Sequence, residues 1–562
     1  MSNRDFSLAH QIIWDRLIAI VEDQAQTLVR TAFSTTVREA GDLSAGLFDN
    51  QGRMLAQAIT GTPGHVNAMA ASVKFFLEKF EIASLKPGDV LLTNDPWLGT
   101  GHLNDFTVVT PVFYQDSLIG LFAATSHIAD VGGLGFGADG KQVYEEGINL
   151  PIGYLFKQGT VNATLIEILR ANVRDPDAAE GDLYSLASCN KVASDSLIEA
   201  MKEFSIGNLD ATADRVIETS RNAMLTHISE LPEGAWTNSM KIDGYHEPID
   251  LKCKIVISAK GINIDWSGTS KKSVHGINVP LTYAQAYSCF GVRCLIGNDI
   301  PNNSGSLSVI RVSAPLGCIL NAPRPAAVSA RHMIGQMLPD VVMGALDEPL
   351  QQNVIAEGAA CLYGPVFYGG KDFVSESKSE PFVMNAFYTG GTGARPKKDG
   401  LSCTAFPSGV RGTPVEIAET SSPMIMLKKE YRPGSGGEGE FRGGLGQIIE
   451  FAHIEKEPFY VSKMFDRINN PPRGRHGGRG GKPARVYLKD DRVLNGMGRE
   501  LIPAGKTFVL ETAGGGGLGK AESRDPNSKQ NDEKENLTTA PFCNLLEIVY
   551  RFFKPATKRG GD

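Results

Sequence analysis

The sequence predicts a mixed α and β fold, with an N-terminal α/β region followed by strand-rich regions. Residues 7–33 repeat apolar side chains at spacings of three and four, which is typical of an amphipathic helix. Residues 106–125 contain two apolar, β-type runs around a short polar turn, which favours a hairpin. The chain also holds 62 glycines, an abundance that favours turns and tight loops over long helices.

Helical and strand patterns alternate along the chain. After the helix at 7–33, short strand-like runs at 44–48 and 54–58 flank a polar turn. The remaining expected elements, in chain order, are a helix near 66–82, a buried strand at 89–94, the hairpin strands 106–114 and 118–125, helices over 177–229, strands from about 240, a helical stretch at 325–350, and short strands between glycine loops after about 385.

The changes of pattern divide the chain into four segments. At about 100–200 residues per domain, 562 residues correspond to about three domains. We expect an N-terminal region at 1–240, a middle α+β region at 241–385, a glycine-rich and strand-rich region at 386–526, and a tail at 527–562. The polar, aperiodic start of this tail predicts disorder, so a chain ending near Pro526 is expected to stay folded.

Charge and composition argue against several classes of protein. The net charge of −7 argues against general nucleic-acid binding, which needs an excess of Lys and Arg. No apolar run approaches the roughly 18 residues of a membrane span, and residues 1–6 lack the apolar core of a secretory signal. The eight cysteines are scattered and form no CxxC pair, which fits reduced thiols. The expected location is the cytoplasm.

The ends of the predicted hairpin carry the strongest candidate site. His102 and Asp105 come just before its first strand, and His127 comes just after its second strand. Antiparallel pairing places these two ends side by side, with strands about 4.8 Å apart. Two imidazoles and a carboxylate that converge in this way can form an open transition-metal site with room for water. This makes the N-terminal region the expected metal-bearing part of the chain.

Further carboxylates and a histidine lie at neighbouring strand ends. Asp42 begins the strand near 43–48, His65 follows the return strand, and Asp95 ends the strand at 89–94. A single His or Asp at a strand end is more often a cap, a turn or a surface residue. From spacing alone, an Asx-turn role therefore stays open for Asp95 and Asp105.

The segment 514–521 is nearly a phosphate-binding P-loop. It reads Gly-Gly-Gly-Gly-Leu-Gly-Lys-Ala, with Ala521 where a Mg²⁺-binding Ser or Thr belongs, and no apolar helix follows it. A flexible glycine turn is the favoured interpretation, and this chain is not expected to bind ATP itself.

These motifs resemble those of the hydantoinase B/oxoprolinase family, in order and over about residues 7–525. The site motifs are among them: Gly101-His-Leu-Asn-Asp105 and the run from His127 to Gly133. The other matching segments are 38–49, 94–96, 146–148, 172–174, 181–183, 265–269, 299–301, 406–414, 430–433, 441–446 and 511–517. After Pro526 the family pattern disappears.

The resemblance implies a set of metal ligands. The family ligands fall on His102, Asp105 and His127, with Asp42 as a candidate to complete or bridge a second metal and Glu146 as a weaker candidate. His65 and Asp95 lie in matching motifs, as ligands or as supports of ligands. Imidazole and carboxylate ligands together suit a divalent transition metal (Zn, Mn, Fe or Co) better than Mg or Ca.

The resemblance also implies a function shared between two subunits. A hydantoinase A-type partner would bind ATP and Mg²⁺ and activate the carbonyl of a cyclic amide, of hydantoin or 5-oxoproline type. This chain would supply the metal-activated water that opens the ring. Two alternatives stay open: a subunit of an acetone- or acetophenone-type carboxylase, and a non-catalytic assembly subunit. With a hydantoinase A-type partner, a hetero-oligomer without nucleic acid or membrane is expected.

Overall fold

An antiparallel sheet of seven strands forms the centre of the N-terminal part. The computed structural model describes residues 3–375 and 377–538. The strand order is β2-β1-β5-β4-β3-β6-β7, and every neighbouring pair is antiparallel. The strands are β1 (Leu43–Phe48), β2 (Met54–Gln57), β3 (Val90–Thr93), β4 (Asp105–Tyr114), β5 (Ser117–His127), β6 (Gly153–Lys157) and β7 (Thr160–Val161).

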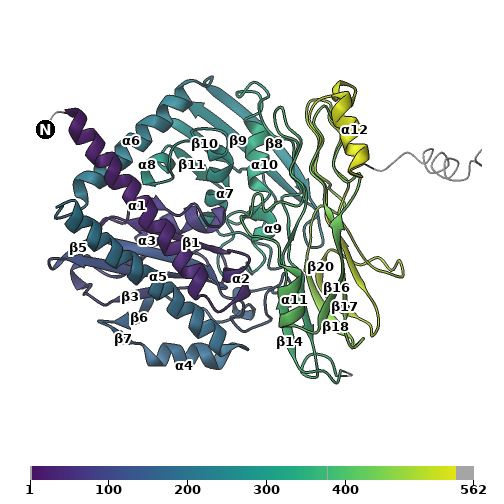
Figure 1. Ribbon diagram of the computed structural model, residues 1–562, viewed down its shortest axis with the longest axis horizontal. Coiled ribbons are helices and arrows are strands. Elements are labelled where there is room, and N and C mark those ends of the chain that lie inside the picture. The colour runs from purple at the N-terminus through teal and green to yellow at the C-terminus, as the bar shows by residue number, and fades with distance from the viewer. Residues whose placement is uncertain (1–2, 376, 539–562) are drawn as a thin grey trace, which may run out of the picture.

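Helices cover both faces of this sheet (Figure 1). Helices α1 (Asn3–Thr31) and α5 (Pro176–Glu203) pack together over one face, and α3 (Pro63–Lys79) packs on the other. Successive residues of a strand point to opposite faces of the sheet. Val108 therefore packs in the core under α1 and α5, and Val109 packs in the core under α3. The other helices of this part are α2 (Thr35–Arg38), α4 (Ala163–Asn172) and α6 (Asp210–Ser229).

The hairpin of β4 and β5 fixes the register on which the candidate site depends. Its turn has two central residues, Gln115 and Asp116, with φ of 49° and 63°. Positive φ at both positions is typical of a type I′ turn, whose twist matches that of paired strands. From this turn the register runs back to the pair formed by Asp105 and His127. The predicted meeting of the hairpin ends is therefore confirmed.

A second, four-stranded sheet forms the middle part. Its order is β11-β10-β9-β8, and helices α7 (Leu281–Arg293) and α10 (Leu338–Ala345) pack against it. Its strands are β8 (Gly234–Ile242), β9 (Ile249–Ser258), β10 (Gly261–Asp265) and β11 (Ile310–Ser313), and the short helices are α8 (Ser304–Leu307) and α9 (His332–Gly335). Only α9 and α10 fall in the predicted helical stretch at 325–350.

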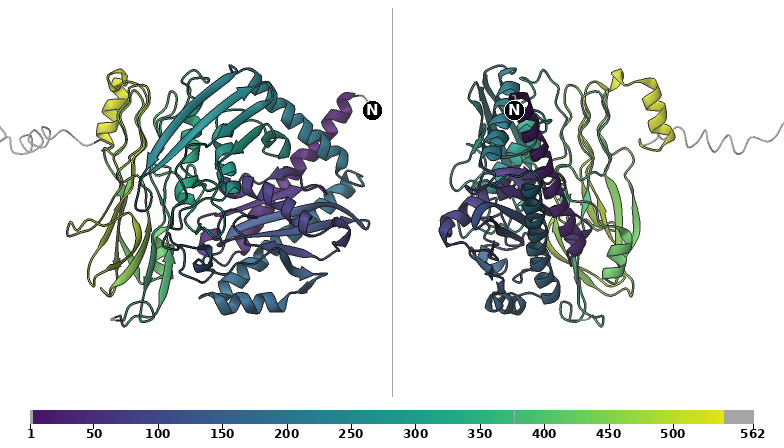
Figure 2. Two further views of the ribbon diagram at one scale, coloured as in Figure 1. Left: turned by 180° about the vertical axis from the view of Figure 1, so that it is seen from behind. Right: turned by 60° about the vertical axis from the view of Figure 1, so that its left-hand side comes forward.

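The strand-rich C-terminal part is a sandwich of two antiparallel sheets (Figure 2). Phe367 of one sheet contacts Phe451 and Phe508 of the other, at ring distances of 4.8 Å and 5.9 Å. One sheet holds β14 (Phe382–Asn385), β13 (Val366–Gly369), β18 (Phe459–Met464) and β20 (Met497–Ile502); the other holds β16 (Met424–Tyr431), β17 (Gln447–His453), β21 (Phe508–Glu511) and β19 (Arg485–Leu488). Beside them lie the pair β12 (Leu362–Tyr363) and β15 (Tyr388–Thr389), and helix α11 (Val415–Ser421).

The sheets cross two of the predicted segment boundaries. Residue 240 lies inside β8, and β13 and β14, which precede residue 386, share a sheet with β18 and β20. Mixed α and β architecture is confirmed.

The glycine segment 514–519 is packed rather than flexible. Each of its amides donates to a backbone carbonyl; Gly515 and Gly516, for example, donate to Gly444 and Glu357 at 2.9 and 2.8 Å. A Cβ atom at Gly515 would lie 1.8 Å from the carbonyl oxygen of Thr392. Glycine is therefore required by close backbone approach, and these amides are not available to a phosphate group.

The prediction of disorder from residue 527 is wrong for its first residues. Helix α12 (Pro526–Lys534) forms there, and Asp532 is buried at its centre. The Asp532 carboxylate lies 2.6 Å from Arg524 and 3.3 Å from Arg442, both buried. Composition alone missed this helix because a single buried carboxylate, rather than an apolar face, docks it. Residues 539–562 lie outside the described part.

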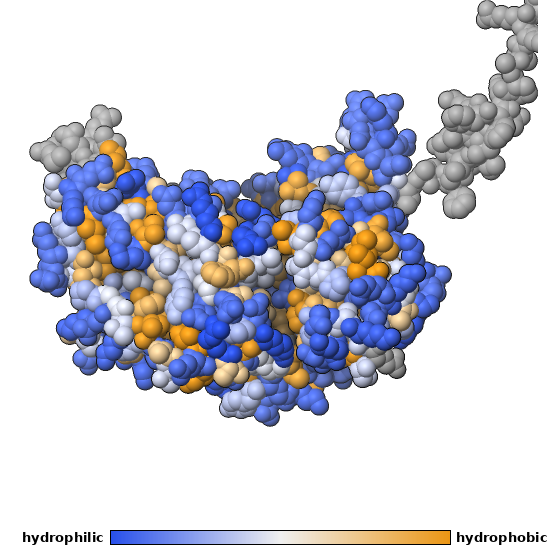
Figure 3. All heavy atoms as spheres, turned by 60° about the horizontal axis from the view of Figure 1, so that its bottom comes forward, coloured by the Kyte–Doolittle hydropathy of each residue, from blue (hydrophilic) through white to orange (hydrophobic). Residues whose placement is uncertain are grey.

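One face of the chain is largely polar. The face shown in Figure 3 is mostly hydrophilic, and its apolar side chains lie in separate small clusters. Among the described residues, no helix has the length and apolar character needed to cross a bilayer.

Removing the buried charge of α12 should destabilise the protein. Asp532→Asn leaves Arg442 without its carboxylate, so we expect a loss of about 1–3 kcal/mol and a melting temperature lower by about 2 °C or more. Glu533→Gln, an equivalent change at an exposed position of the same helix, is the control. Equal melting temperatures for the two variants would contradict the docking role of Asp532.

Candidate metal centre

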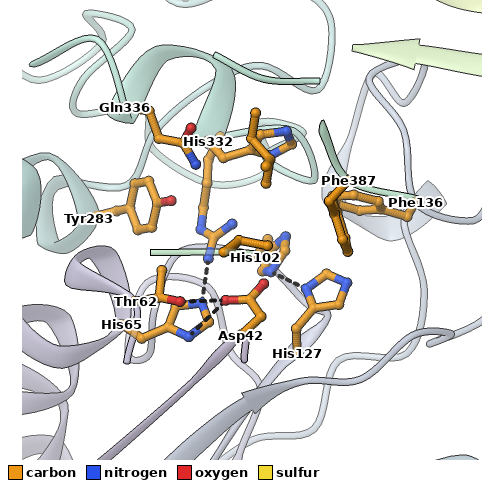
Figure 4. A pocket seen from close by; sticks show the side chains of 13 residues that line it. Asp42, Thr62, His65, His102, His127, Phe136, Tyr283, His332, Gln336 and Phe387 are labelled. Carbon is orange, nitrogen blue, oxygen red and sulfur yellow. Dashed lines mark hydrogen bonds and ion pairs between the residues drawn. The ribbon is translucent and has the colours of Figure 1, made fainter. Parts of the chain in front are cut away.

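Three segments meet at the end of the hairpin. His102 lies in the loop before β4, Asp105 is the first residue of β4, and His127 is the last residue of β5. Strand β1 pairs with the other side of β5, so Asp42 also arrives there, and its carbonyl accepts a hydrogen bond from the amide of His127 at 3.2 Å. Figure 4 shows Asp42, His102 and His127 converging on one space.

The three predicted ligands present a compact set of donor atoms. Nε2 of His102 lies 2.6 Å from Oδ1 of Asp105, and Nδ1 of His127 lies 3.3 Å from both of these atoms. A metal ion with bonds of about 2.0–2.2 Å holds its ligand atoms roughly 3.0–3.4 Å apart. The donor atoms are already close to this spacing, so only small shifts would bring them around one ion. All three residues are buried.

The protonation of His102 fits a metal ligand. Its Nδ1 lies 2.9 Å from the carbonyl oxygen of Ser329, which can only accept, so Nδ1 carries the proton. Burial and the nearby charge of Arg331 lower the pKa of His102 to about 4, so the ring is neutral near pH 7. Nε2 therefore presents a lone pair toward a carboxylate oxygen. A cation between these atoms would satisfy both of them.

The second oxygen of Asp105 is held by three donors. Arg331 and Thr100 donate to Oδ2, Thr100 at 2.5 Å, and Nε2 of His65 lies 2.9 Å from the same atom. Burial alone would raise the pKa of Asp105, but the positive charges of His65 and Arg331 hold it well below its ordinary value. The carboxylate is thus ionised and fixed, with Oδ1 left to the two histidines.

Gly101 allows Arg331 to reach this carboxylate. Its φ is 101°, and a Cβ atom built there would lie 2.6 Å from Cδ of Arg331. The guanidinium also lies over the ring of Tyr283, at 4.1 Å from its centroid. A glycine just before His102 is therefore a packing requirement of the site as well as a conformational one.

Asp42 and His65 line the same cavity beside the donor group. The Asp42 carboxylate accepts from the Thr62 hydroxyl at 2.9 Å and lies 3.5 Å from Nδ1 of His65. Burial lowers the pKa of His65, but Asp105 and Asp42 outweigh it, so the net shift is upward. A histidine that favours its protonated form supports the two carboxylates instead of supplying a lone pair.

The structure places Asp95 and Glu146 away from the donor group. Asp95 accepts a hydrogen bond from the amide of Trp97 at 3.0 Å, which is the Asx turn given as its alternative role. It also forms an ion pair with Arg324. Oε1 of Glu146 accepts from the amides of Val328 and Ser329 at 2.8 Å each. Glu146 thereby supports the turn whose carbonyl binds His102, which differs from the ligand role predicted for it.

A cavity of about 20 Å³ lies above these ligands. That space holds about one water molecule. Phe136 closes one side, edge-on to His127 at 5.0 Å and stacked on His332 at 5.6 Å. Burial and Arg331 hold the pKa of His332 well below its ordinary value, so its ring is neutral. Nε2 of His332 and Oε1 of Gln336 are buried in the described structure without hydrogen-bond partners.

Sequence reasoning missed the residues that complete the site. Arg331, His332, Gln336, Tyr283 and Phe136 all line this cavity, and only the structure reveals them. One signal was available: Arg331 and His332 are adjacent polar residues inside the mostly apolar stretch around 326–346. Buried polar residues of this kind often mark a functional site.

Comparison with known proteins identifies the family of the chain. The sequence profile of the hydantoinase B/oxoprolinase family matches residues 7–521. The chain belongs to this family. A Pseudomonas sp. (strain NS671) protein assigned as the B-type subunit of a D-/L-hydantoinase is 26% identical, with 94% of this chain and 92% of that protein covered. The 5-oxoprolinase 1 of Arabidopsis thaliana is 29% identical over 90% of this chain, which spans only 41% of that protein.

Two solved structures share the fold of this family member. A nucleotide-free acetone carboxylase structure superposes with a TM-score of 0.85 at 18% identity, covering 96% of this chain and 79% of that one. The ATP-dependent caprolactamase of Pseudomonas jessenii superposes with a TM-score of 0.84 at 21% identity, covering 95% and 94%.

Loss of any one donor should empty the metal centre. We expect the purified chain to hold at least one transition metal ion, and His102→Ala, Asp105→Asn and His127→Ala to lower metal content sharply. Asp42→Asn should lose less. His227→Ala, a half-exposed histidine of α6, is the control. Elemental analysis measures metal per chain, and full metal content in the three donor variants would refute the site.

Burial of Glu146 should make stability depend on pH. Burial raises the pKa of Glu146 to about 8, from an ordinary value of 4.5. A raised carboxyl pKa contributes stability that is complete below about pH 4.5 and is lost as the pH rises toward 8. Glu146→Gln keeps the accepting oxygen and cannot ionise. The melting temperature of the variant relative to the native chain should therefore rise between pH 5.5 and 8.5; a constant difference would contradict this.

Proposed function

We propose that this chain is the metal-bearing catalytic subunit of an ATP-dependent amidohydrolase that opens cyclic amides of hydantoin or 5-oxoproline type. The observation that carries the proposal is the donor group of His102, Asp105 and His127, beside a cavity with room for one water molecule. The names of the hydantoinase and 5-oxoprolinase relatives support the substrate class.

In this proposal the residues around the cavity have different roles in hydrolysis. His102, Asp105 and His127 would hold a divalent transition metal, and Asp42 would complete its shell or hold a second ion. When bound, such a metal activates water and polarises a carbonyl group. Nε2 of His332 and Oε1 of Gln336, which are buried without hydrogen-bond partners in the described structure, would bind and orient the amide group of the ring.

The small cavity sets a condition on substrate entry. A space for one water molecule cannot admit a five-membered ring, so the side chains that close it must move when substrate binds. Phe136 is the best candidate, because it lies in the loop after β5 and packs against both His127 and His332.

A separate subunit would supply ATP chemistry. The glycine segment 514–519 uses its amides within the fold, which leaves it unsuited to phosphate binding. The 5-oxoprolinase relative is more than twice as long as the region that this chain matches, so it has room for a further activity. We infer a hydantoinase A-type partner that binds ATP and Mg²⁺ and activates the amide carbonyl by phosphorylation.

A carboxylase subunit is the second candidate. It is favoured by the similarity of fold to acetone carboxylase, which is as close as the similarity to caprolactamase. The same metal centre could serve either reaction. ATP turnover that requires both a ketone and bicarbonate would identify a carboxylase, whereas turnover with a lactam or hydantoin alone would identify a hydrolase.

The chain alone should neither hydrolyse ATP nor open lactam rings, even when loaded with metal. Nitrogen lone-pair donation makes an amide carbonyl a poor electrophile, so activation by the partner is needed first. The assay compares hydantoins and 5-oxoproline with and without partner and ATP. His127→Ala in the complete mixture is the control that removes metal chemistry. Rapid ring opening without ATP by the chain alone would contradict the two-subunit mechanism.

A further inference from the structure

A second cavity, much larger than the metal cavity, lies in the middle part of the chain. Its volume is about 430 Å³, and it is lined by residues 245–248 between β8 and β9, Ile249 at the start of β9, residues 270–275 after β10, and Ile277 and Ile319. This volume is within the range of roughly 300–1,000 Å³ that is usual for small-molecule sites. No residue lines both cavities.

The cavity combines an apolar floor with a basic rim. Ile249, Ile277 and Ile319 are buried and form the floor, while Lys271 and Lys272 are exposed at the rim. Within the described residues, neither lysine side chain forms an ion pair or a hydrogen bond with a protein group. Glu247 is the one carboxylate of the lining, and the two lysines outnumber it.

One wall of the cavity is an ordered aromatic cluster. The rings of Tyr245 and His275 stack at 3.8 Å with an angle of 9°, and His246 lies edge-on to both. The hydroxyl of Tyr245 donates to Asp139 at 2.5 Å, and this hydrogen bond holds the tyrosine ring in its stack with His275. Nδ1 of His275 is buried without a hydrogen-bond partner, so the wall retains an unused polar atom.

We propose that this cavity binds a small organic anion, with a carboxylate or phosphate group on an apolar body. The two unpaired lysines fit the anionic group, and the isoleucine floor fits the apolar body. An inorganic anion would leave the floor uncovered, and a neutral apolar ligand would leave the lysines unused. The proposal is independent of the function of the metal centre, since the two cavities share no residue.

Titration calorimetry on the full chain tests this proposal with four probes. Phenyl phosphate and phenylacetate carry both features, inorganic phosphate carries only the charge, and benzyl alcohol carries only the apolar body. We expect at least one of the two organic anions to bind, and to bind more tightly than both of the single-feature probes. The tighter of the two organic anions identifies whether the site prefers phosphate or carboxylate.

Variants place the binding in this cavity. Lys271→Gln with Lys272→Gln should weaken binding of the organic anion about tenfold or more, as expected for lost charge-assisted hydrogen bonds. Val274→Glu, at an exposed rim position, should weaken it through charge repulsion. Lys254→Gln, an exposed lysine of β9 outside the cavity, is the matched control. His127→Ala should bind the probe normally, which separates this site from the metal centre.

Three results would overturn the proposal. These are no binding of either organic anion to the native chain, equal affinity for inorganic phosphate or benzyl alcohol, and affinity that is unchanged in the double lysine variant. Failure of the metal-centre predictions would leave the outcome of this experiment unaffected, because none of the four probes requires a metal ion.

Discussion

The carboxylate of Asp105 is the charge around which the candidate site is built. One oxygen faces His102 and His127, and the other is held by Arg331, Thr100 and His65. A buried carboxylate is costly unless it is paired and hydrogen-bonded. The arginine and the supporting histidine offset that cost and leave the first oxygen free to act as a ligand. Displacing Asp105 would therefore disturb the donor group and the packing of Arg331 together.

The site lies where the three parts of the chain meet. The donor group lies at one end of the N-terminal sheet. In the middle part, α7 contributes Tyr283, and the N-cap residue of α9 is Arg331. Phe387, next to β15, closes the cavity from the C-terminal part. The size of this cavity therefore depends on how the three parts pack together.

The sequence pattern of the hairpin predicted that the donor residues meet, because a hairpin is formed by residues that are close in the sequence. His102, Asp105 and His127 lie within 26 residues, and strand alternation with a short turn set their register. Arg331 and His332 come more than 200 residues later, and no local period indicates that they return to this hairpin. Likewise, α12 has no apolar face to recognise; the ion pairs of Asp532 hold it, and pairing between distant charges is not visible in one sequence.

Anomalous X-ray diffraction from crystals of the purified chain tests the central claim most directly. With data collected at the absorption edge of the metal identified in the sample, we predict a peak within about 2.0–2.3 Å of Nε2 of His102, Oδ1 of Asp105 and Nδ1 of His127. Crystals grown with added Zn²⁺ or Mn²⁺ that show no peak at these three atoms, or a peak only elsewhere, would contradict the assignment of this centre.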